Sequence, residues 1–510
     1  MTDAAAPQTG ASASVRAAAF PRYPSLIEIN TRVWLHRLSC EAGRPITLAE
    51  VDDASLDELA RRGFDWIWLL SVWRTGPASR ALSRRNAAWR AEFQAVLPDL
   101  TEEDISGSGF AISAYEVDEA LGGREALAEF RTRLAARGLR LMLDFVPNHT
   151  ALDHPWVSAH PEFYVEGSEE DLTRSPQNYS RVKTDYGPRI MAHGRDPNFP
   201  GWTDTLQLNY SNPVLQAAQL AEMVSIAEQC DGLRCDMAML LLPEVFQRSW
   251  SVTPAPFWPK AIAAVRRSNP EFTFLAEAYW GLEWELQQQG FDYCYDKRLY
   301  DRLRTANATS IRAHLAAGVD YQARLARFLE NHDEPRAAAV FPWLRHQAAA
   351  MVTFFAPGLR FFHEGQLDGA RIHFPVHLRR GPWEPPDLKI VEFYERLLTL
   401  LHEAETFRRG AWSLISPEAA WPGNPTWQDF IAYAWQDLDR DDHVMVVNYA
   451  DHQGQCYLRL PFKNLNSGRL RLIDVMGSES YDREGSGLMG PGLYIDLGPW
   501  RYNLFRLQRI

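Results

Sequence analysis

Short apolar runs rich in β-forming residues alternate with segments of helical periodicity from residue 25 to about residue 402. This alternation is typical of βα units arranged around a parallel sheet. Several of the runs are apolar almost throughout, as expected of strands that are buried on both faces. The candidate strands are residues 25–34, 64–73, 139–146, 231–237, 272–278, 291–296, 327–331 and 359–363. Eight such strands predict an α/β fold, and a closed (β/α)8 TIM barrel rather than an open doubly wound sheet.

Three further segments do not follow this alternation. Residues 1–24 are rich in small residues and proline, and we expect a disordered tail there. Residues 150–209 form a connection far longer than an ordinary βα loop, which predicts an inserted small domain after strand 3. Residues 403–510 contain alternating strands without intervening helices, which predicts a C-terminal antiparallel β-sandwich. The catalytic barrel is then expected to comprise residues 25–149 and 210–402.

Charge and cysteine usage exclude several classes of partner. The chain carries a formal net charge of −12 and has no dense basic run, so nucleic acid is not expected as a partner. Its 5 cysteines are scattered without CxxC spacing, which argues against a zinc site and a disulfide framework and favours a reducing compartment. The sequence contains no signal-peptide pattern and no apolar run of ~20 residues, so we expect a cytoplasmic protein without a membrane partner.

Polar residues close four of the predicted strands. They are Asp144, Asn148 and His149 on the third strand, Arg234 and Asp236 on the fourth, Glu277 on the fifth, and His332 and Asp333 on the seventh. Taken singly, each has an ordinary structural explanation: Asp144 could cap a loop, and Arg234 could merely pair with Asp236. Taken together they predict a functional site, because the carboxyl ends of barrel strands converge on one rim and a buried acid cluster is costly.

These four segments resemble the four short motif regions of the α-amylase family of retaining glycoside hydrolases and transglycosylases. The segments are Asp144–His149 (D-x-x-x-N-H), Gly232–Asp236 (G-x-R-x-D), Glu277 in LAEAYW, and Asn331–Asp333 (N-H-D). Any one motif is weak, but four in the family's order are specific. The inserted segment and the C-terminal sandwich are also similar to the second and third domains of that family.

The resemblance and the chemistry of the residues imply the same catalytic roles. Asp236 is the expected nucleophile, Glu277 the general acid/base, and Asp333 the carboxylate that stabilises the transition state. Arg234 is expected to keep Asp236 ionised, and an apolar surrounding is expected to keep Glu277 protonated. The expected substrate-binding residues are Asp144, His149, Arg234, His332, Phe110 and Trp280.

The resemblance implies no organic cofactor but leaves calcium open. In many relatives the residue at Asn148 helps to bind structural Ca²⁺, and Asp171, Asp185, Asp196 and Asp204 are available as further oxygen ligands in the insertion. Two departures from the family pattern also occur. Met239 and Leu240 replace a common Lys-His pair after the nucleophile, which weakens the calcium expectation. The acids that exo-acting relatives often have after the second strand are absent, and their positions are occupied by Gly107, Ala111 and Ala114.

The predicted function is a retaining α-glycosidase that acts on a small soluble α-linked oligosaccharide or glucoside. An α-glucan transglycosylase or a trehalose-forming enzyme of the same family is an alternative, since it differs only in the acceptor that attacks the covalent intermediate. A non-catalytic carbohydrate-binding relative is a second alternative, against which the intact acid cluster counts.

Overall fold

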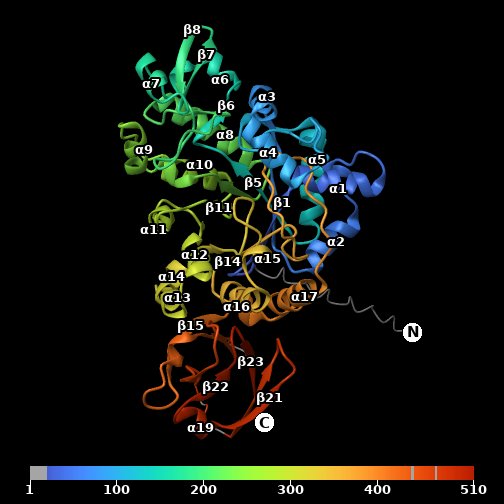
Figure 1. Ribbon diagram of the computed structural model, residues 1–510, viewed down its shortest axis with the longest axis vertical. Coiled ribbons are helices and arrows are strands. Elements are labelled where there is room, and N and C mark those ends of the chain that lie inside the picture. Colours follow the sequence, from blue (N-terminus) through green and yellow to red (C-terminus); the bar gives the residue numbers. More distant parts are fainter. Residues whose placement is uncertain (1–19, 438–441, 464, 466–467) are drawn as a thin grey trace, which may run out of the picture.

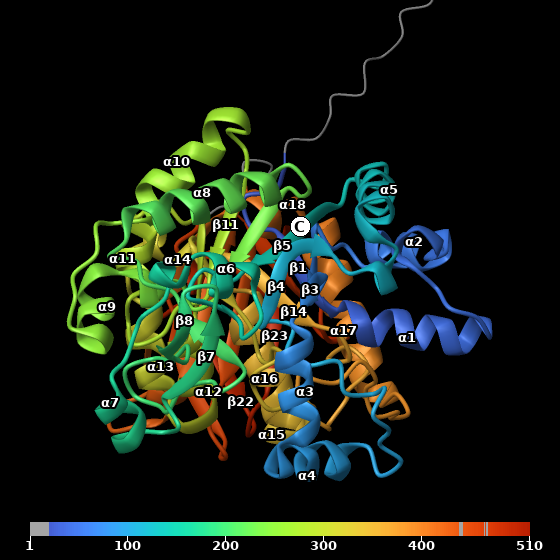
Figure 2. The ribbon, with the colours of Figure 1, turned by 90° about the horizontal axis from the view of Figure 1, so that it is seen from above.

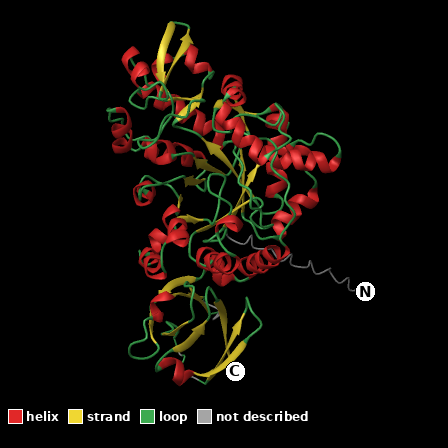
Figure 3. Cartoon of the chain, in the orientation of Figure 1, coloured by secondary structure: helices red, strands yellow, loops and turns green. Residues whose placement is uncertain are grey.

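The predicted barrel is confirmed by a computed structural model, which describes residues 20–437, 442–463, 465 and 468–510. Eight parallel strands form a closed barrel in the order β1-β14-β13-β12-β11-β10-β5-β2 (Figures 1 and 3). These strands are β1 (Ser25–Asn30), β2 (Trp66–Leu70), β5 (Arg140–Phe145), β10 (Gly232–Cys235), β11 (Thr273–Ala276), β12 (Tyr293–Tyr295), β13 (Leu325–Arg327) and β14 (Leu359–His363). Large apolar side chains such as Trp66, Trp68 and Phe361 fill the barrel interior, so it is a packed core rather than a pore.

Helices surround the barrel (Figure 2). They are α1 (Thr31–Ala42), α2 (Asp53–Arg61), α5 (Gly123–Ala135), α8 (Pro213–Ala227), α9 (Pro243–Trp250), α10 (Trp258–Ser268), α11 (Glu283–Gln288), α12 (Lys297–Thr305), α13 (Ala308–Leu315), α14 (Val319–Gln322), α15 (Ala337–Val340), α16 (Trp343–Phe354), α17 (Leu388–Glu403) and α18 (Glu405–Arg409). Helix α5 shows how they pack, because Leu127, Phe130 and Leu134 lie on one buried face at helical spacing.

Two barrel strands end four residues earlier than the sequence indicated. Strand β1 stops at Asn30, because the Asn30 side chain accepts a hydrogen bond from the Val33 N–H and caps helix α1. The seventh strand was expected at residues 327–331, but β13 ends at Arg327, which pairs with the buried carboxylate of Asp296 at 3.1 Å. The N-H-D segment therefore lies on a loop beyond the strand and not on the strand itself.

Two long connections extend the carboxyl end of the barrel. The first contains β3 (Trp73–Thr75), α3 (Pro77–Arg85), α4 (Ala87–Val96) and β4 (Ile112–Val117). The second is the insertion after the third barrel strand, with β6 (His149–Ala151), α6 (Pro155–Ala159), α7 (Glu169–Arg174), β7 (Tyr179–Thr184), β8 (Gly187–Ala192) and β9 (Thr205–Gln207). Strands β6 and β9 pair and close the insertion at its base.

The C-terminal region folds as two antiparallel sheets at the opposite end of the long axis from the insertion (Figure 1). The elements are β15 (Ala411–Ile415), β16 (Pro417–Ala419), β17 (Phe430–Gln436), β18 (His443–Asn448), β19 (Gly454–Leu458), β20 (Arg469–Asp474), β21 (Ser480–Glu484), α19 (Gly485–Met489), β22 (Leu493–Leu497) and β23 (Tyr502–Arg509). The larger sheet packs against the barrel helices, where Tyr433 Oη and Trp435 Nε1 donate to carbonyls of the α16 region.

Most of the predicted N-terminal tail lies outside the described residues. Its last five residues contradict the prediction, because Tyr23 is fully buried and contacts Trp435 edge-on at 5.3 Å. The Arg360 guanidinium also donates to the Tyr23 carbonyl, so this segment is anchored to the barrel. In the part of the chain that is described, none of the helices combines the length and the apolarity needed to cross a bilayer.

Candidate active site

Two carboxylates follow neighbouring strands at the carboxyl end of the barrel. Asp236 comes directly after β10, and Glu277 comes directly after β11. The backbone pairing continues beyond both strands, since the Asp236 N–H donates to the Phe145 carbonyl at 2.8 Å and the Glu277 N–H donates to the Cys235 carbonyl at 3.1 Å. Regular backbone pairing thereby fixes both side chains at one rim.

The guanidinium of Arg234 joins these two carboxylates. Its Nη1 donates to Asp236 Oδ1 at 2.6 Å, and its Nη2 forms an ion pair with Glu277 Oε2 at 2.7 Å. Its Nε donates to the Tyr295 hydroxyl at 3.2 Å, and the group lies over the Trp68 ring at 5.2 Å. Because Arg234 is completely buried, it reaches substrate only through the carboxylates that it holds.

Burial raises the pKa of both carboxyl groups. The pKa of Glu277 is about 7, because burial and the nearby charge of Asp236 outweigh the contact with Arg234. Burial also raises the pKa of Asp236 above its ordinary value, and the charge of Arg234 opposes this rise. Glu277 accepts hydrogen bonds from the Tyr279 hydroxyl at 2.8 Å and from the Met237 N–H at 2.7 Å. Glu277 therefore changes protonation near neutral pH.

Met237, whose N–H donates to Glu277, has a strained backbone. Met237 has φ = 43°, a left-handed conformation that non-glycine residues rarely adopt, at a cost of about 1 kcal/mol or more. The strained residue follows Asp236 directly, and such outliers cluster at functional sites.

The third expected carboxylate, Asp333, lies on the loop after β13 with its side chain 47% exposed. The Asn331 side chain accepts hydrogen bonds from the N–H groups of Asp333 and Glu334, which shapes the loop. His332 Nε2 lies 3.2 Å from Asp333 Oδ2, and His332 Nδ1 contacts Glu28 Oε1. Burial raises the pKa of Asp333, but the charge of His332 outweighs burial and holds that pKa at about 2.

The buried acid Asp144 lies beneath this rim. Its Oδ1 accepts from Trp68 Nε1 at 3.1 Å, and its Oδ2 accepts from the Ser71 N–H at 3.2 Å. It is 1% exposed and does not line the cavity described next, so its expected role as a substrate-binding residue is not supported by its position. Burial raises the pKa of Asp144 to about 7, and Arg234 opposes this rise.

A cavity of about 210 Å³ opens above the three carboxylates. It is lined by Trp89, Ser108, Phe110, His149, Trp202, Asp204, Thr205, Asp236, Met237, Glu277, Asp333 and His377. The Phe110 ring lies 5.3 Å from both the Arg234 guanidinium and the His332 ring, which places an aromatic face beside the acids as expected. Trp280 is 41% exposed and does not line this cavity.

His149 also faces the cavity as expected, but as a neutral imidazole. Burial lowers the pKa of His149 to about 4, although Asp204 and Glu277 oppose the fall. The Asn148 amide nitrogen lies 3.4 Å from His149 Nδ1, and an amide nitrogen only donates. His149 Nε2 therefore carries the hydrogen and is available to donate.

Two cavity residues carry polar atoms without a hydrogen-bond partner. His377 Nε2 lies 3.5 Å from Asp204 Oδ2, too poorly aligned for a hydrogen bond. Within the described structure, both ring nitrogens of His377 and the Oδ2 of Asp204 are buried without such a partner. Buried polar atoms are nearly always satisfied, so these atoms point to ligand hydroxyls or ordered water in the cavity.

Three of the residues considered for calcium make other contacts. Asn148 Oδ1 accepts from Gln207 Nε2 at 2.9 Å, and Asn148 Nδ2 donates to Gln207 Oε1 at 3.2 Å. Asp171 caps helix α7 and Asp196 accepts two backbone N–H groups of its own loop. Among the residues that the structure describes, no three His, Cys, Asp or Glu side chains are grouped so that they could hold a metal.

Several residues of the site were not found from the sequence. Glu28 stands inside the first strand, where an acid gives no motif signal of its own. Gln207 and His377 lie in long connections without periodicity, and nothing in the sequence placed them at the barrel rim. Asp204 was considered only as a calcium ligand, whereas it lines the cavity.

The fold and the site together define a (β/α)8 barrel with an acid-lined cavity at the carboxyl ends of its strands. The sequence profile of the α-amylase catalytic domain matches residues 54–371, more than half of the chain. The chain therefore belongs to the α-amylase family.

Individual relatives are distant. Alpha-amylase MalA of Haloarcula japonica is 24% identical over 364 residues, which cover 69% of this chain and 49% of MalA. An alpha-1,4-glucan:maltose-1-phosphate maltosyltransferase of Rhodospirillum rubrum is 29% identical over 256 residues, covering 47% of this chain and 29% of that protein. The chain thus spans half or less of the length of these curated relatives. The maltogenic alpha-amylase AmyB of Thermotoga neapolitana shares the fold, with a TM-score of 0.67 and 18% identity over 96% of this chain and 99% of that one.

Proposed function

We propose that the protein is a retaining α-glycosidase that acts on short soluble α-glucosides or malto-oligosaccharides. The observation that carries the proposal is the contact of one buried guanidinium, that of Arg234, with both Asp236 and Glu277 at the floor of a cavity. A retaining mechanism needs two carboxyl groups about 5 to 5.5 Å apart, one as a nucleophile and one as an acid. Two carboxylates bound to the same guanidinium are held within such reach of each other.

This chemistry gives the two carboxyl groups different tasks. Asp236 attacks the anomeric carbon, while Glu277 donates its proton to the glycosidic oxygen, which leaves with the aglycone. Glu277 is then ionised and removes a proton from water, whose oxygen displaces Asp236 and releases the sugar. A pKa of about 7 suits a group that must give and regain a proton near neutral pH.

Asp333 and His332 assist through charge. Since the pKa of Asp333 is about 2, its carboxylate is ionised and stabilises the positive charge that develops on the sugar ring. His332 holds Asp333 in place, and neutral His149 can donate a hydrogen bond to a sugar hydroxyl without adding positive charge.

The size of the cavity favours a short substrate. Its volume of about 210 Å³ is below the ~300 Å³ at which pockets for drug-sized ligands begin. Aromatic rings of Trp89, Phe110 and Trp202 line it, and such rings stack against the C–H faces of sugars. We therefore propose that one sugar unit is enclosed and that the remainder of the substrate extends outwards.

Glycosyl transfer is a second candidate, favoured by the match to a protein named as a maltosyltransferase. In that case a sugar hydroxyl replaces water as the acceptor, and a trehalose-forming reaction is one form of this. The free cysteines, four of which are buried, support a reducing, cytoplasmic location for either enzyme.

The test is product analysis with maltose, maltotriose, sucrose, and α-1,6- and α,α-1,1-linked glucosides. We expect turnover of at least one of them, with the α-anomer appearing first in a proton NMR time course. Free glucose indicates hydrolysis, whereas new oligosaccharides indicate transfer. First appearance of the β-anomer would refute the retaining mechanism. Saturable binding without any turnover would identify a non-catalytic carbohydrate-binding protein.

A further inference from the structure

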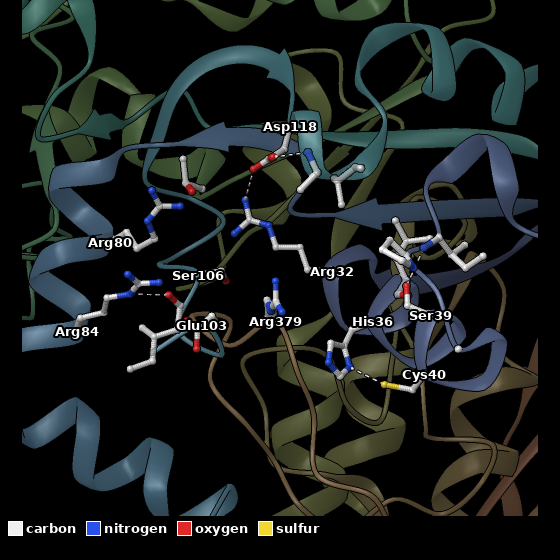
Figure 4. Close-up of a pocket in the computed structure, with 18 residues that line it drawn as sticks. Arg32, His36, Ser39, Cys40, Arg80, Arg84, Glu103, Ser106, Asp118 and Arg379 are labelled. Carbon is white, nitrogen blue, oxygen red and sulfur yellow. Dashed lines mark hydrogen bonds and ion pairs between the residues drawn. The ribbon is translucent and has the colours of Figure 1, made fainter. Parts of the chain in front are cut away.

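A second, larger cavity of about 830 Å³ lies beside the barrel and shares no lining residue with the catalytic cavity. Helices α1 and α3, the loop before β4, and the connection after β14 form its walls (Figure 4). Four arginines from these elements surround the same space, which we call the arginine cavity (Figure 4). They are Arg32, Arg80, Arg84 and Arg379.

Positive charge prevails in the arginine cavity. Its four arginines face only two carboxylates, Glu103 and Asp118, although the whole chain carries a net charge of −12. In the described part of the chain, the side chains of Arg80 and Arg379 form neither a hydrogen bond nor an ion pair. Two guanidinium groups are thus free to bind an anion.

The innermost cation, Arg32, is buried with little compensation. It is 8% exposed, and it donates to the carbonyls of Trp73 at 3.2 Å and Gly107 at 3.5 Å. The nearest carboxylate is that of Asp118, at 3.8 Å. A buried cation with one distant partner is costly, so an anion in the cavity would stabilise it.

Part of the remaining wall is apolar. Leu35, Ile46 and Leu121 line the cavity together with the arginines. A volume of about 830 Å³ exceeds what a bare phosphate fills and lies within the range of sites for organic ligands, ~300 to 1,000 Å³. Guanidinium groups bind phosphate oxygens in pairs of parallel hydrogen bonds.

We infer that the arginine cavity binds a phosphate-bearing small molecule, whose phosphate contacts the arginines and whose organic part lies against the apolar wall. The cavity is linked to the catalytic one, because the Ser106 N–H and hydroxyl both donate to the His377 carbonyl, at 2.9 and 3.1 Å. Ser106 lines the arginine cavity and His377 lines the catalytic cavity.

Isothermal titration calorimetry with three probes at constant ionic strength tests this inference. The probes are glucose 6-phosphate, inorganic phosphate and uncharged glucose. We expect saturable binding of glucose 6-phosphate, weakened at least tenfold in an Arg80→Ala/Arg379→Ala double variant. Tighter binding of the sugar phosphate than of inorganic phosphate would show that the organic part contributes and would support the inference. Equal affinity for inorganic phosphate would show that the phosphate alone is recognised and would overturn the role given to the apolar wall.

Arg85→Ala is the matched control, since Arg85 is an exposed arginine on the same helix and does not line the cavity. It should bind glucose 6-phosphate as the wild type does. The double variant removes two side chains without hydrogen bonds, so its melting temperature should be unchanged, and Arg80→Glu provides a charge reversal if it is not. No saturable binding of either phosphate up to 10 mM, or equal affinity in wild type and double variant, would overturn the inference. The assay needs no turnover, so it is independent of the proposed function.

Discussion

The imidazole of His332 contacts the carboxylate of Glu28 inside the barrel, although the two residues are 304 positions apart in the chain. Burial lowers the pKa of His332, but the charges of Asp333 and Glu28 on either side outweigh burial and raise that pKa well above its ordinary value. The Glu28 side chain does not line the catalytic cavity. Its effect on the reaction passes through His332, so Glu28 is a positioning residue.

Glu28→Gln should expose this dependence. Glutamine keeps the shape and can still accept from His332, but it lacks the charge, so the pKa of His332 should fall. The protonated fraction of His332 is lost as pH rises through its pKa, so kcat/KM of the variant should decline about tenfold more on the alkaline side than the kcat/KM of the wild type, which falls there only through Glu277. Removing one partner of a buried pair should also cost about 3 kcal/mol of unfolding free energy. A pH–rate profile and an NMR titration of His332 measure these effects.

Glu330→Gln is the matched control. Glu330 is equally buried and accepts from Arg336 and contacts His363, but it does not line the catalytic cavity. It should lose stability without altering the pH profile. If both variants change the profile alike, the assignment of Glu28 as a positioning residue is wrong.

Glu277→Gln should separate proton donation from attack. Loss of the acid should lower kcat/KM on maltose, which reports formation of the covalent intermediate, by about 10³, since general acid catalysis contributes 10² to 10⁴. The loss should be much smaller on α-glucosyl fluoride, because fluoride leaves without a proton. Asp236→Asn should abolish turnover of both substrates with the fold intact. Equal losses on the two substrates for Glu277→Gln would contradict its role as the acid.

The wild-type pH profile provides a further check on Glu277. A pKa of about 7 means that the protonated form predominates below pH 7 and disappears above it. We expect kcat/KM to fall tenfold per pH unit well above pH 7, and this fall should be absent from Glu277→Gln acting on the fluoride. A wild-type profile that stays flat to pH 9 would contradict the assignment.

The sequence predicted the barrel because the β-rich runs are local signals, and it predicted the catalytic acids because they follow such runs directly. Asp236 and Glu277 each close a strand, so the fold class alone placed them at one rim. Asp144 also occupies a motif position, but a motif does not reveal how deeply a side chain is buried. Its carboxylate is held by Trp68 and Ser71 beneath the cavity.

The remaining residues of the site depend on the paths of long connections. Trp89 lies on α4, Asp204 in the insertion and His377 after β14, and these three meet only in the folded protein. No periodicity in the sequence predicts that these residues lie together, because loop conformation depends on packing between distant segments. Trp280 shows the opposite case. Its place beside Tyr279 in the sequence suggested that it lines the cavity, but its side chain is exposed and lies outside the cavity. Its backbone has a φ of 60°.

Asp204 and His377 should govern substrate affinity. Their side chains line the cavity and carry buried polar atoms without a hydrogen-bond partner. We expect Asp204→Asn and His377→Ala each to raise KM for a short glucoside about tenfold, with kcat changed less than threefold, because an interaction made equally in ground and transition states affects KM alone.

Asp196→Asn is the control for these two variants. Asp196 is also buried in the insertion, but it accepts hydrogen bonds from its own loop and does not line the cavity. Its KM should remain that of the wild type. An unchanged KM in both Asp204→Asn and His377→Ala would show that these side chains do not contact substrate.

Calcium removal should leave the protein intact, because Gln207 supplies the contacts that hold Asn148. Gln207 Nε2 donates to the Asn148 carbonyl at 3.0 Å and to its Oδ1 at 2.9 Å. EDTA should therefore shift the melting temperature by less than about 1 °C. Gln207→Leu should lower the unfolding free energy by about 2 kcal/mol, since buried carbonyl oxygens lose their donor.

Gln216→Leu controls for the loss of an amide, because Gln216 donates to the Tyr210 carbonyl from a less buried position. It should cost less than half as much unfolding free energy as Gln207→Leu. Since an amide pair needs no metal, added Ca²⁺ should stabilise neither variant. A drop of several degrees with EDTA that Ca²⁺ reverses would place a metal at Asn148 and make the amide pair a secondary contact.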